Sequence, residues 1–186
     1  MWKPPEAGPQ ICWVRLLAGF TAPDVFAVTS QIFFHDPAKR REETGKTRAV
    51  FEKGFLRLWH DDISAGDEAT STLPVFWAGG GACAYDRRRY LEIGGLDELF
   101  HPFYVEDTDL SYQAWKRGWR CLLSPSSRVV HKHRATSSRF SHRYVDETTR
   151  RNLFLFVWKN VTGWRMTASH ILNLPRIHGQ QWMAGN

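Results

Sequence analysis

The chain has 186 residues, of which 42% are hydrophobic and 14% aromatic. This is enough apolar material to bury the core of one domain, and it excludes an intrinsically disordered chain. Lys and Arg number 25 against 19 Asp and Glu, a formal net charge of +6. Such a charge suits an anionic partner, whether a nucleotide diphosphate, a nucleic acid or an anionic lipid.

The cysteines and the apolar runs bound the cellular setting. Cys12, Cys83 and Cys121 are far apart and show no metal-binding spacing, so we expect free thiols in a reducing cytoplasm. No apolar run has the length of a membrane span. The sequence therefore predicts a cytoplasmic protein that is soluble or lies peripherally on the inner membrane face.

The first half of the chain alternates apolar runs with loops. Val25 to Phe34 is rich in β-branched and aromatic residues and predicts a strand. Residues 38–72 are polar and interrupted by glycines, so we expect a long loop with short helical turns. A further strand is predicted at Leu73 to Trp77, and it resumes at Ala82 to Tyr85 after Gly79–Gly81.

Two helices follow. Asp86 is placed to cap a short helix from Arg87 to Ile93. The clearest helix begins at Glu106 or the next residue and ends near Arg117. Asp109 falls on its polar side and is expected to face solvent. The residues expected to be buried along its apolar side are Leu110, Ala114, Trp115 and Trp119.

The last third of the sequence predicts two short strands and a helical tail. The strands are expected at residues 119–123 and 128–133, around a turn that contains proline. From Ser141 onward the pattern is helical, with a break near Gly163 and a stop at Pro175.

Two groups of residues could carry chemistry. Glu106 and Asp107 stand at a helix start, where the helix dipole favours ionised carboxylates. An ionised carboxylate at the edge of a cleft can take a proton from a hydroxyl, although paired acids at this position are more often caps. His131 and His133 share one face of the last predicted strand. A neutral imidazole there could bind a divalent metal or make a structural hydrogen bond.

These features occur in an order that resembles the second half of family-2 glycosyltransferases, which have the GT-A fold. The matching segments are GGGACAYDRRRYLEIGG, the GGLDE turn, the EDTDL helix start, the KRGW helix end and the VVHKH strand, all within residues 25–137. The resemblance is to bacterial rhamnosyltransferase-like members. It implies an α/β partial GT-A fold, with a mixed sheet flanked by helices. Residues 1–140 would form the acceptor-side half and 141–186 a helical C-terminal extension.

The resemblance also assigns roles to the charged residues. Asp107 would be the general base that deprotonates an acceptor hydroxyl as the oxygen attacks the anomeric carbon of the donor, with inversion. Glu106 would orient that base or bind acceptor. His131 would join the site of a divalent metal, Mg or Mn, that holds the donor diphosphate.

Substrate contacts are implied in two further places. Gly79, Gly80 and Gly81 would let the backbone pack closely against a sugar, unless they only form a bulge. Asp97 and Glu98 would shape the acceptor pocket, unless Asp97 only closes its turn. The implied partners are a nucleotide-sugar donor and a glycan or lipid-linked acceptor. The basic, aromatic tail would touch a membrane surface or pack as a helix pair on the domain.

The first half of the family's pattern is not found. No nucleotide-binding βαβ region or strand-ending DxD motif precedes Val25, and 24 residues are too few for a unit of roughly 30. The Asp107–Asp109 run is not interpreted as that DxD, because it begins a helix. We therefore expect a truncated chain, or one whose nucleotide-binding half lies elsewhere, that binds nucleoside diphosphates weakly by itself.

Two other classes of protein remain open. One is a non-catalytic remnant that kept the fold, against which the intact Glu106, Asp107 and His131 argue. The other is a basic module that binds nucleic acid or another anion. The arginines that it would use are Arg87–Arg89, Arg139, Arg143, Arg150 and Arg151. They are scattered among acids, and no zinc-finger, RNP-like or helix-turn-helix pattern accompanies them, so no nucleic-acid partner is expected.

Overall fold

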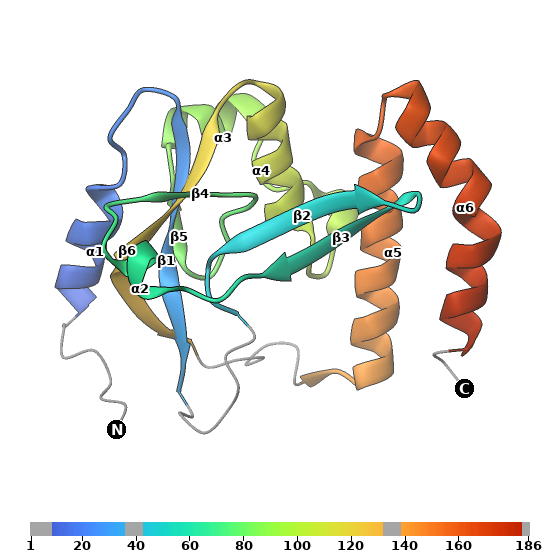
Figure 1. Cartoon of the computed structure of the whole chain (residues 1–186), viewed down its shortest axis with the longest axis horizontal. Coiled ribbons are helices and arrows are strands. Elements are labelled where there is room, and N and C mark those ends of the chain that lie inside the picture. The colour runs from blue at the N-terminus through green and yellow to red at the C-terminus, as the bar shows by residue number, and fades with distance from the viewer. Residues whose placement is uncertain (1–8, 36–42, 132–138, 184–186) are drawn as a thin grey trace.

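The computed structural model describes residues 9–35, 43–131 and 139–183, except the side chains of residues 9–11, 131 and 178–183 (Figure 1). The strands are β1 (Val25–Phe34), β2 (Thr47–Glu52), β3 (Phe55–His60), β4 (Leu73–Val75), β5 (Cys83–Tyr85) and β6 (Arg120–His131). The helices are α1 (Pro9–Leu17), α2 (Ala65–Glu68), α3 (Arg87–Ile93), α4 (Glu106–Lys116), α5 (His142–Asn160) and α6 (Trp164–Met183), with a 3-10 turn, η1 (Glu98–Phe100).

Four strands form a mixed sheet in the order β4-β6-β1-β5, which confirms the predicted sheet. β1 runs parallel to β6, while β4 and β5 are antiparallel to their neighbours. β1 is buried along almost its whole length, as expected of an apolar strand with a partner on each side. The two short strands predicted at residues 119–133 were wrong as separate elements. β6 is one strand, and its register along β1 jumps from Ser124 to Arg128.

The long loop predicted at residues 38–72 was also wrong in its middle part. β2 and β3 pair antiparallel from Thr47 opposite His60 to Glu52 opposite Phe55. The two residues between them, Lys53 and Gly54, have φ angles of 51° and 80°, which fits a tight two-residue hairpin turn. This hairpin reaches across the molecule towards α5 and α6 (Figure 1).

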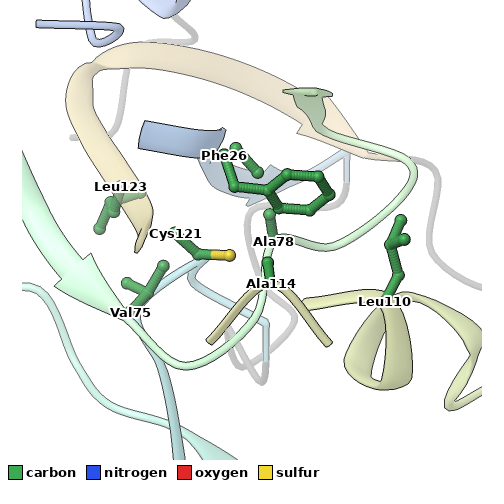
Figure 2. Close-up of a cluster of buried hydrophobic side chains, with 8 residues drawn as sticks. Phe26, Val75, Ala78, Leu110, Ala114, Cys121 and Leu123 are labelled. Carbon is green, nitrogen blue, oxygen red and sulfur yellow. The ribbon is translucent and has the colours of Figure 1, made fainter. Parts of the chain in front are cut away.

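One buried cluster joins the sheet to α4 (Figure 2). Its members are Phe26, Ala27, Val75, Ala78, Leu110, Ala114, Cys121 and Leu123. The predicted burial of Leu110 and Ala114 is thus confirmed. Trp119 is half-buried and stacks on Phe26. The predicted burial of Trp115 was wrong, because 37% of its surface is exposed and its indole only reaches the carbonyl of Phe76.

A second cluster joins α5 to the rest of the molecule. Phe156 and Val157 of α5 pack with Leu56 of the hairpin, Phe100 of η1 and Val105. The first helix of the tail is therefore packed on the sheet-containing part, which was one of the two interpretations of the tail; the boundary at residue 140 stays a prediction.

α6 continues through Pro175, where the sequence predicted a stop. Pro175 cannot donate to the carbonyl of Ile171 four residues earlier, but both residues are exposed, so water can reach that carbonyl. Nearer its start, α6 contacts the hairpin turn, where His170 Nδ1 lies 2.7 Å from the carbonyl oxygen of Gly54. Among the helices that the structure describes, none is long and apolar enough to cross a membrane.

Candidate active site

The Glu106–Asp107 pair lies at the first turn of α4, as the sequence predicts. The helix starts without a side-chain cap, since Val105 occupies the N-cap position. Asp107 Oδ1 accepts a hydrogen bond of 2.7 Å from the backbone N–H of Thr108, and its Oδ2 accepts one of 3.1 Å from the N–H of Gly80. The Asp107 carboxylate therefore joins the helix start to the glycine segment that follows β4.

Burial governs the acidity of this pair. Desolvation raises the pKa of Asp107, although the N–H groups of Gly80 and Thr108 act in the opposite direction. Desolvation also raises the pKa of Glu106, and the neighbouring charge of Asp107 adds to the increase. A carboxylate with a raised pKa is a stronger base once it is ionised, so both groups suit proton transfer better than a fully solvated acid.

Glu106 contains an oxygen that the rest of the described structure leaves unsatisfied. Its Oε2 is buried and has no hydrogen-bond partner among the described residues. Buried polar atoms are normally paired, so an exception calls for an explanation. A bound hydroxyl would supply the missing donor, which fits the predicted role of Glu106 in acceptor binding.

The glycine segment lies beside Asp107 and is open to solvent on its other side. A Cβ atom at Gly79 would lie 3.9 Å from Asp107 Oδ2, whereas one at Gly80 or Gly81 would meet nothing within 4 Å. Gly80 and Gly81 are both exposed. Bare backbone with free space in front of it can be approached closely by a ligand, which is the role that the sequence predicts.

The two acidic residues of the GGLDE turn have different surroundings. Asp97 Oδ1 accepts a hydrogen bond from the N–H of Leu99, so it does close its turn. Its Oδ2 also accepts from Lys159 Nζ at 2.7 Å, and this hydrogen bond lowers the pKa of Asp97. Glu98 is exposed beside it at the start of η1. Asp97 is thus tied to α5, while Glu98 faces solvent.

The expectation that Asp109 faces solvent was wrong. Only 2% of its surface is exposed. Its Oδ2 accepts from Lys159 Nζ at 2.6 Å and its Oδ1 from Asn160 Nδ2 at 2.7 Å. The polar side of α4 is covered by α5, so a carboxylate there is buried and paired. With both oxygens engaged, Asp109 does not form a free DxD pair with Asp107.

The sequence-based reasoning also missed the partners that α5 supplies. Asn152 is fully buried and donates to backbone carbonyls of the segment that leads into α4. Lys159 and Asn160 hold Asp109. The available signal was two amides and an ammonium within an otherwise apolar helical stretch, residues 152–160. Polar residues in such a stretch usually have a buried partner.

The predicted metal site is not completed by the described residues. His131 ends β6, but its side chain lies outside the described residues, and His133 lies outside them altogether. Elsewhere in the described part of the chain, no three His, Cys, Asp or Glu side chains come together as a metal-binding group. The chemistry considered below is therefore confined to the carboxylates and the backbone around them.

The cysteines do not provide an alternative nucleophile at this site. Cys12, Cys83 and Cys121 are free thiols, as predicted. Burial raises the pKa of Cys83 and of Cys121 to about 12, so neither forms the reactive thiolate at neutral pH.

Comparison with solved structures identifies the fold. The structure of GalNAc-T7 with UDP, GalNAc and Mn2+ matches 78% of this chain and 28% of that protein, with a TM-score of 0.54 and 19% sequence identity. The chain therefore has the fold of a GT-A glycosyltransferase, which confirms the predicted fold class. No protein family model matches the sequence.

Curated relatives agree with the resemblance drawn from the motifs. An N-acetylglucosaminyl-diphospho-decaprenol L-rhamnosyltransferase of Mycobacterium tuberculosis is 30% identical over 94 residues, which are 50% of this chain and 30% of that protein. A putative polypeptide N-acetylgalactosaminyltransferase 10 of Drosophila melanogaster is 28% identical over 134 residues, 70% of this chain and 19% of that protein. The chain thus spans less than a third of the length of either relative.

Proposed function

We propose that this chain carries the acceptor side of a glycosyltransferase site. The reaction is transfer of a sugar from a nucleotide-sugar donor to a hydroxyl of a glycan or lipid-linked acceptor, with inversion at the anomeric carbon. The observation that carries the proposal is the Glu106–Asp107 pair. Asp107 is held against an exposed glycine segment, and Glu106 beside it has a buried oxygen without a partner in the described structure.

In the proposed reaction, Asp107 acts as the general base. The acceptor oxygen forms a bond to the anomeric carbon of the donor as the bond from that carbon to the diphosphate oxygen breaks. The hydroxyl proton passes to the Asp107 carboxylate, and the nucleoside diphosphate departs with the electron pair. Asp107 has acceptor capacity left, since an ionised carboxylate offers about four lone-pair sites and the described donors to it are two N–H groups and, at 3.4 Å, the Thr108 hydroxyl. Glu106 Oε2 would orient the attacking hydroxyl.

The donor and the metal are proposed from the comparisons. GalNAc-T7 was solved with UDP and Mn2+, which supports a nucleotide-sugar donor and a divalent metal, Mg or Mn, near His131. The metal would offset charge on the departing diphosphate. Because the chain spans 30% of the mycobacterial relative, we place most of the nucleotide-binding surface outside these 186 residues.

The acceptor is proposed from the name of a relative, and the location from the tail. The name of the mycobacterial relative specifies a diphospho-decaprenol acceptor. The sequence from Thr148 to the end contains no acidic residue. Trp158, Trp164 and Leu172 are exposed on α5 and α6. Exposed aromatic and basic residues without acids suit the surface of an anionic membrane, so we propose peripheral contact on the cytoplasmic side.

The alternative of a nucleic-acid-binding module is disfavoured by the positions of its arginines. Arg89 is buried and donates to the carbonyl of Val25. Arg143 pairs with Glu147, and Arg151 donates to the carbonyl of His101. Arg89 and Arg151, which donate to backbone carbonyls, are less available to phosphates, whereas the pair of Arg143 with Glu147 lies exposed on the surface of α5.

The test is the substitution Asp107→Asn in the protein that contains this chain. The change is nearly isosteric and keeps a hydrogen-bonding side chain, but it removes the proton acceptor. Sugar transfer should fall by roughly 10²- to 10⁴-fold, measured with labelled UDP-, GDP- and dTDP-sugars and with glycan and polyprenyl-diphosphate acceptors. Donor binding should change little.

The matched control is Asp146→Asn, which alters an exposed carboxylate on α5. It should leave both transfer and folding unchanged. Near-normal transfer by a folded Asp107→Asn protein would contradict the proposed base. Product NMR of the new glycosidic bond checks the inversion separately.

A further inference from the structure

The inner face of α5 contacts the chain on both sides of the carboxylate pair. Asn152 lies against the segment before Glu106, and Lys159 and Asn160 lie against Asp109, which follows Asp107 by two residues. α4 stands between the sheet and α5 (Figure 1). The turn that presents the carboxylates is thus bracketed by side chains of one neighbouring helix.

Asn152 organises the segment before the pair. Its Nδ2 lies 2.8 Å from the carbonyl oxygen of Phe100, 2.9 Å from that of Phe103 and 2.9 Å from that of Tyr104. The amide is fully buried, and its own Oδ1 accepts from Arg151. The two N–H bonds of a single amide are therefore shared among three carbonyls that belong to no strand or regular α-helix. Without a donor, such carbonyls would be costly to bury.

That segment has a backbone that needs such support. Tyr104 and Val105 have φ angles of 68° and 78°. Residues other than glycine rarely adopt this left-handed region, and residues branched at Cβ, such as Val105, adopt it least of all. Two such residues in succession, directly before a helix, persist only where the surroundings impose them. The conformation of these two residues sets the direction in which Glu106 and Asp107 leave the backbone.

Lys159 fixes the other side of the pair. Its ammonium lies 2.6 Å from Asp109 Oδ2 and 2.7 Å from Asp97 Oδ2. Burial alone would lower the pKa of Lys159, but the two carboxylates raise it overall, so it remains a cation. Asn160 completes the contact, since its Nδ2 donates to Asp109 Oδ1 at 2.7 Å. The first turn of α4 and the GGLDE turn are thereby held to one point on α5.

We propose that Asn152 and Lys159 are positioning residues for the Glu106–Asp107 pair. They do not touch substrate; they hold the strained segment and the first turn of α4 so that Asp107 faces Gly80 and Glu106 Oε2 stays free for the acceptor. This inference rests on the proposed function for its catalytic consequence. The placement of the carboxylates can be measured without any turnover.

The Gly80 amide is a local reporter of that placement. Because its N–H donates to Asp107 Oδ2, its NMR shift follows the ionisation of Asp107 in a pH titration. In the full chain carrying Asn152→Leu, which keeps the size but removes the donor, this response should disappear. The hydrogen-exchange protection of Gly80 should fall at least about tenfold, while that of β1 amides stays unchanged.

Transfer kinetics provide the second readout. In the active protein, Asn152→Leu should lower kcat by about 10²-fold with the KM for donor within about threefold, as expected when a catalytic group is displaced. Asn152→Ser, which keeps one donor, should recover part of kcat and of the Gly80 response. Lys159→Met should lower kcat and the Gly80 response less than Asn152→Leu does, alongside a loss of global stability, and Lys159→Arg should restore both the kcat and the Gly80 response.

The outcomes separate this inference from the proposed function. A folded Asn152→Leu protein with an unchanged Gly80 response and unchanged kcat would overturn the positioning role, whatever Asp107→Asn does. If Asn152→Leu abolishes the Gly80 response but the wild-type protein transfers no sugar, the positioning role is supported and the proposed function is contradicted. Global unfolding of both Asn152→Leu and Lys159→Met would refute the positioning role, since these side chains would then stabilise the fold as a whole.

Discussion

Two aspartates of α4, two residues apart in the sequence, lie on different sides of the helix and have opposite surroundings. On the side of the glycine segment, Asp107 is half-buried, has no cation bonded to it among the described residues, and has a raised pKa. On the side of α5, Asp109 is buried and bonded to Lys159 and Asn160. A buried carboxylate with a cation is held in place, whereas one whose described donors are uncharged, two N–H groups and the Thr108 hydroxyl, keeps the basicity that proton transfer needs.

The comparison assigns different roles to two aspartates of one helical turn. Asp109 would supply structure and Asp107 chemistry, although both stand in the same EDTDL motif. Removing the cation on one side and changing the pH on the other are the direct ways to test it.

Among the variants that test the contrast between Asp109 and Asp107, Lys159→Met should cost the most stability. The substitution leaves Asp109, 2% exposed, with Asn160 as its remaining described side-chain partner. An unpaired buried charge is strongly destabilising, and because Lys159 itself is partly exposed we expect a loss of about 2–4 kcal/mol. Urea denaturation at pH 7 measures it.

Lys116→Met is the control for that measurement, because Lys116 is exposed and donates to the Asn160 carbonyl in the same helix interface. It should cost less than about 1 kcal/mol. Equal and small losses for the two variants would mean that Asp109 does not depend on its cation, and the contrast with Asp107 would disappear.

The second effect is a pH dependence of opposite sign at Asp107 and Asp97. Ionising Asp107 in the folded protein is unfavourable because its pKa is raised. Asp107→Asn should therefore stabilise the fold at pH 7, and the gain should vanish as the pH falls below the ordinary aspartate value of about 3.8. The pKa of Asp97 is lowered by Lys159. Asp97→Asn should thus destabilise at pH 7, and that loss should shrink as the pH falls through the lowered pKa.

Chemical denaturation of both variants and the wild type at several pH values gives the two curves. Because the pKa of Asp107 is raised, protonation of Asp107 should also slow sugar transfer as the pH decreases. The rate should begin to fall at a pH above the ordinary pKa range of aspartate. Two curves of the same sign would show that the sides of α4 do not differ electrostatically.

Local patterns were enough to predict the elements that carry the pair. β1, α3 and α4 lie where the sequence places them, since each has its own periodicity and its own start and stop residues. The EDTDL motif could be located on a helix start for the same reason. The contact between Asp107 and Gly80 was not predicted, since it joins residues 27 positions apart and the resemblance implied only that both lie at the substrate site.

Long-range pairing accounts for what could not be predicted. The hairpin was missed because Lys53-Gly54 is a weaker turn signal than Asn-Gly. Its apolar residues are interspersed with charged ones over only six residues on each side, within a segment that is polar as a whole. The burial of Asp109 depends on Lys159, 50 positions later. Helical periodicity separates a polar face from an apolar one, but it does not show that a second helix covers the polar face.

The smallest effect is expected at Trp115, on the side of α4 that faces the glycine segment. Trp115 follows Ala114 and so lies about 100° further round the helix, away from the core. Its contribution is one hydrogen bond of 2.9 Å from Nε1 to the carbonyl of Phe76, plus partial burial of the ring. Trp115→Ala should therefore cost about 1–2 kcal/mol, against about 2–5 kcal/mol for Leu110→Ala in the core. Urea denaturation of both variants decides: a loss above about 3 kcal/mol at Trp115 would make its indole part of the core. Trp115→Phe should then recover most of that loss, whereas it should recover little if the hydrogen bond to Phe76 carries the effect.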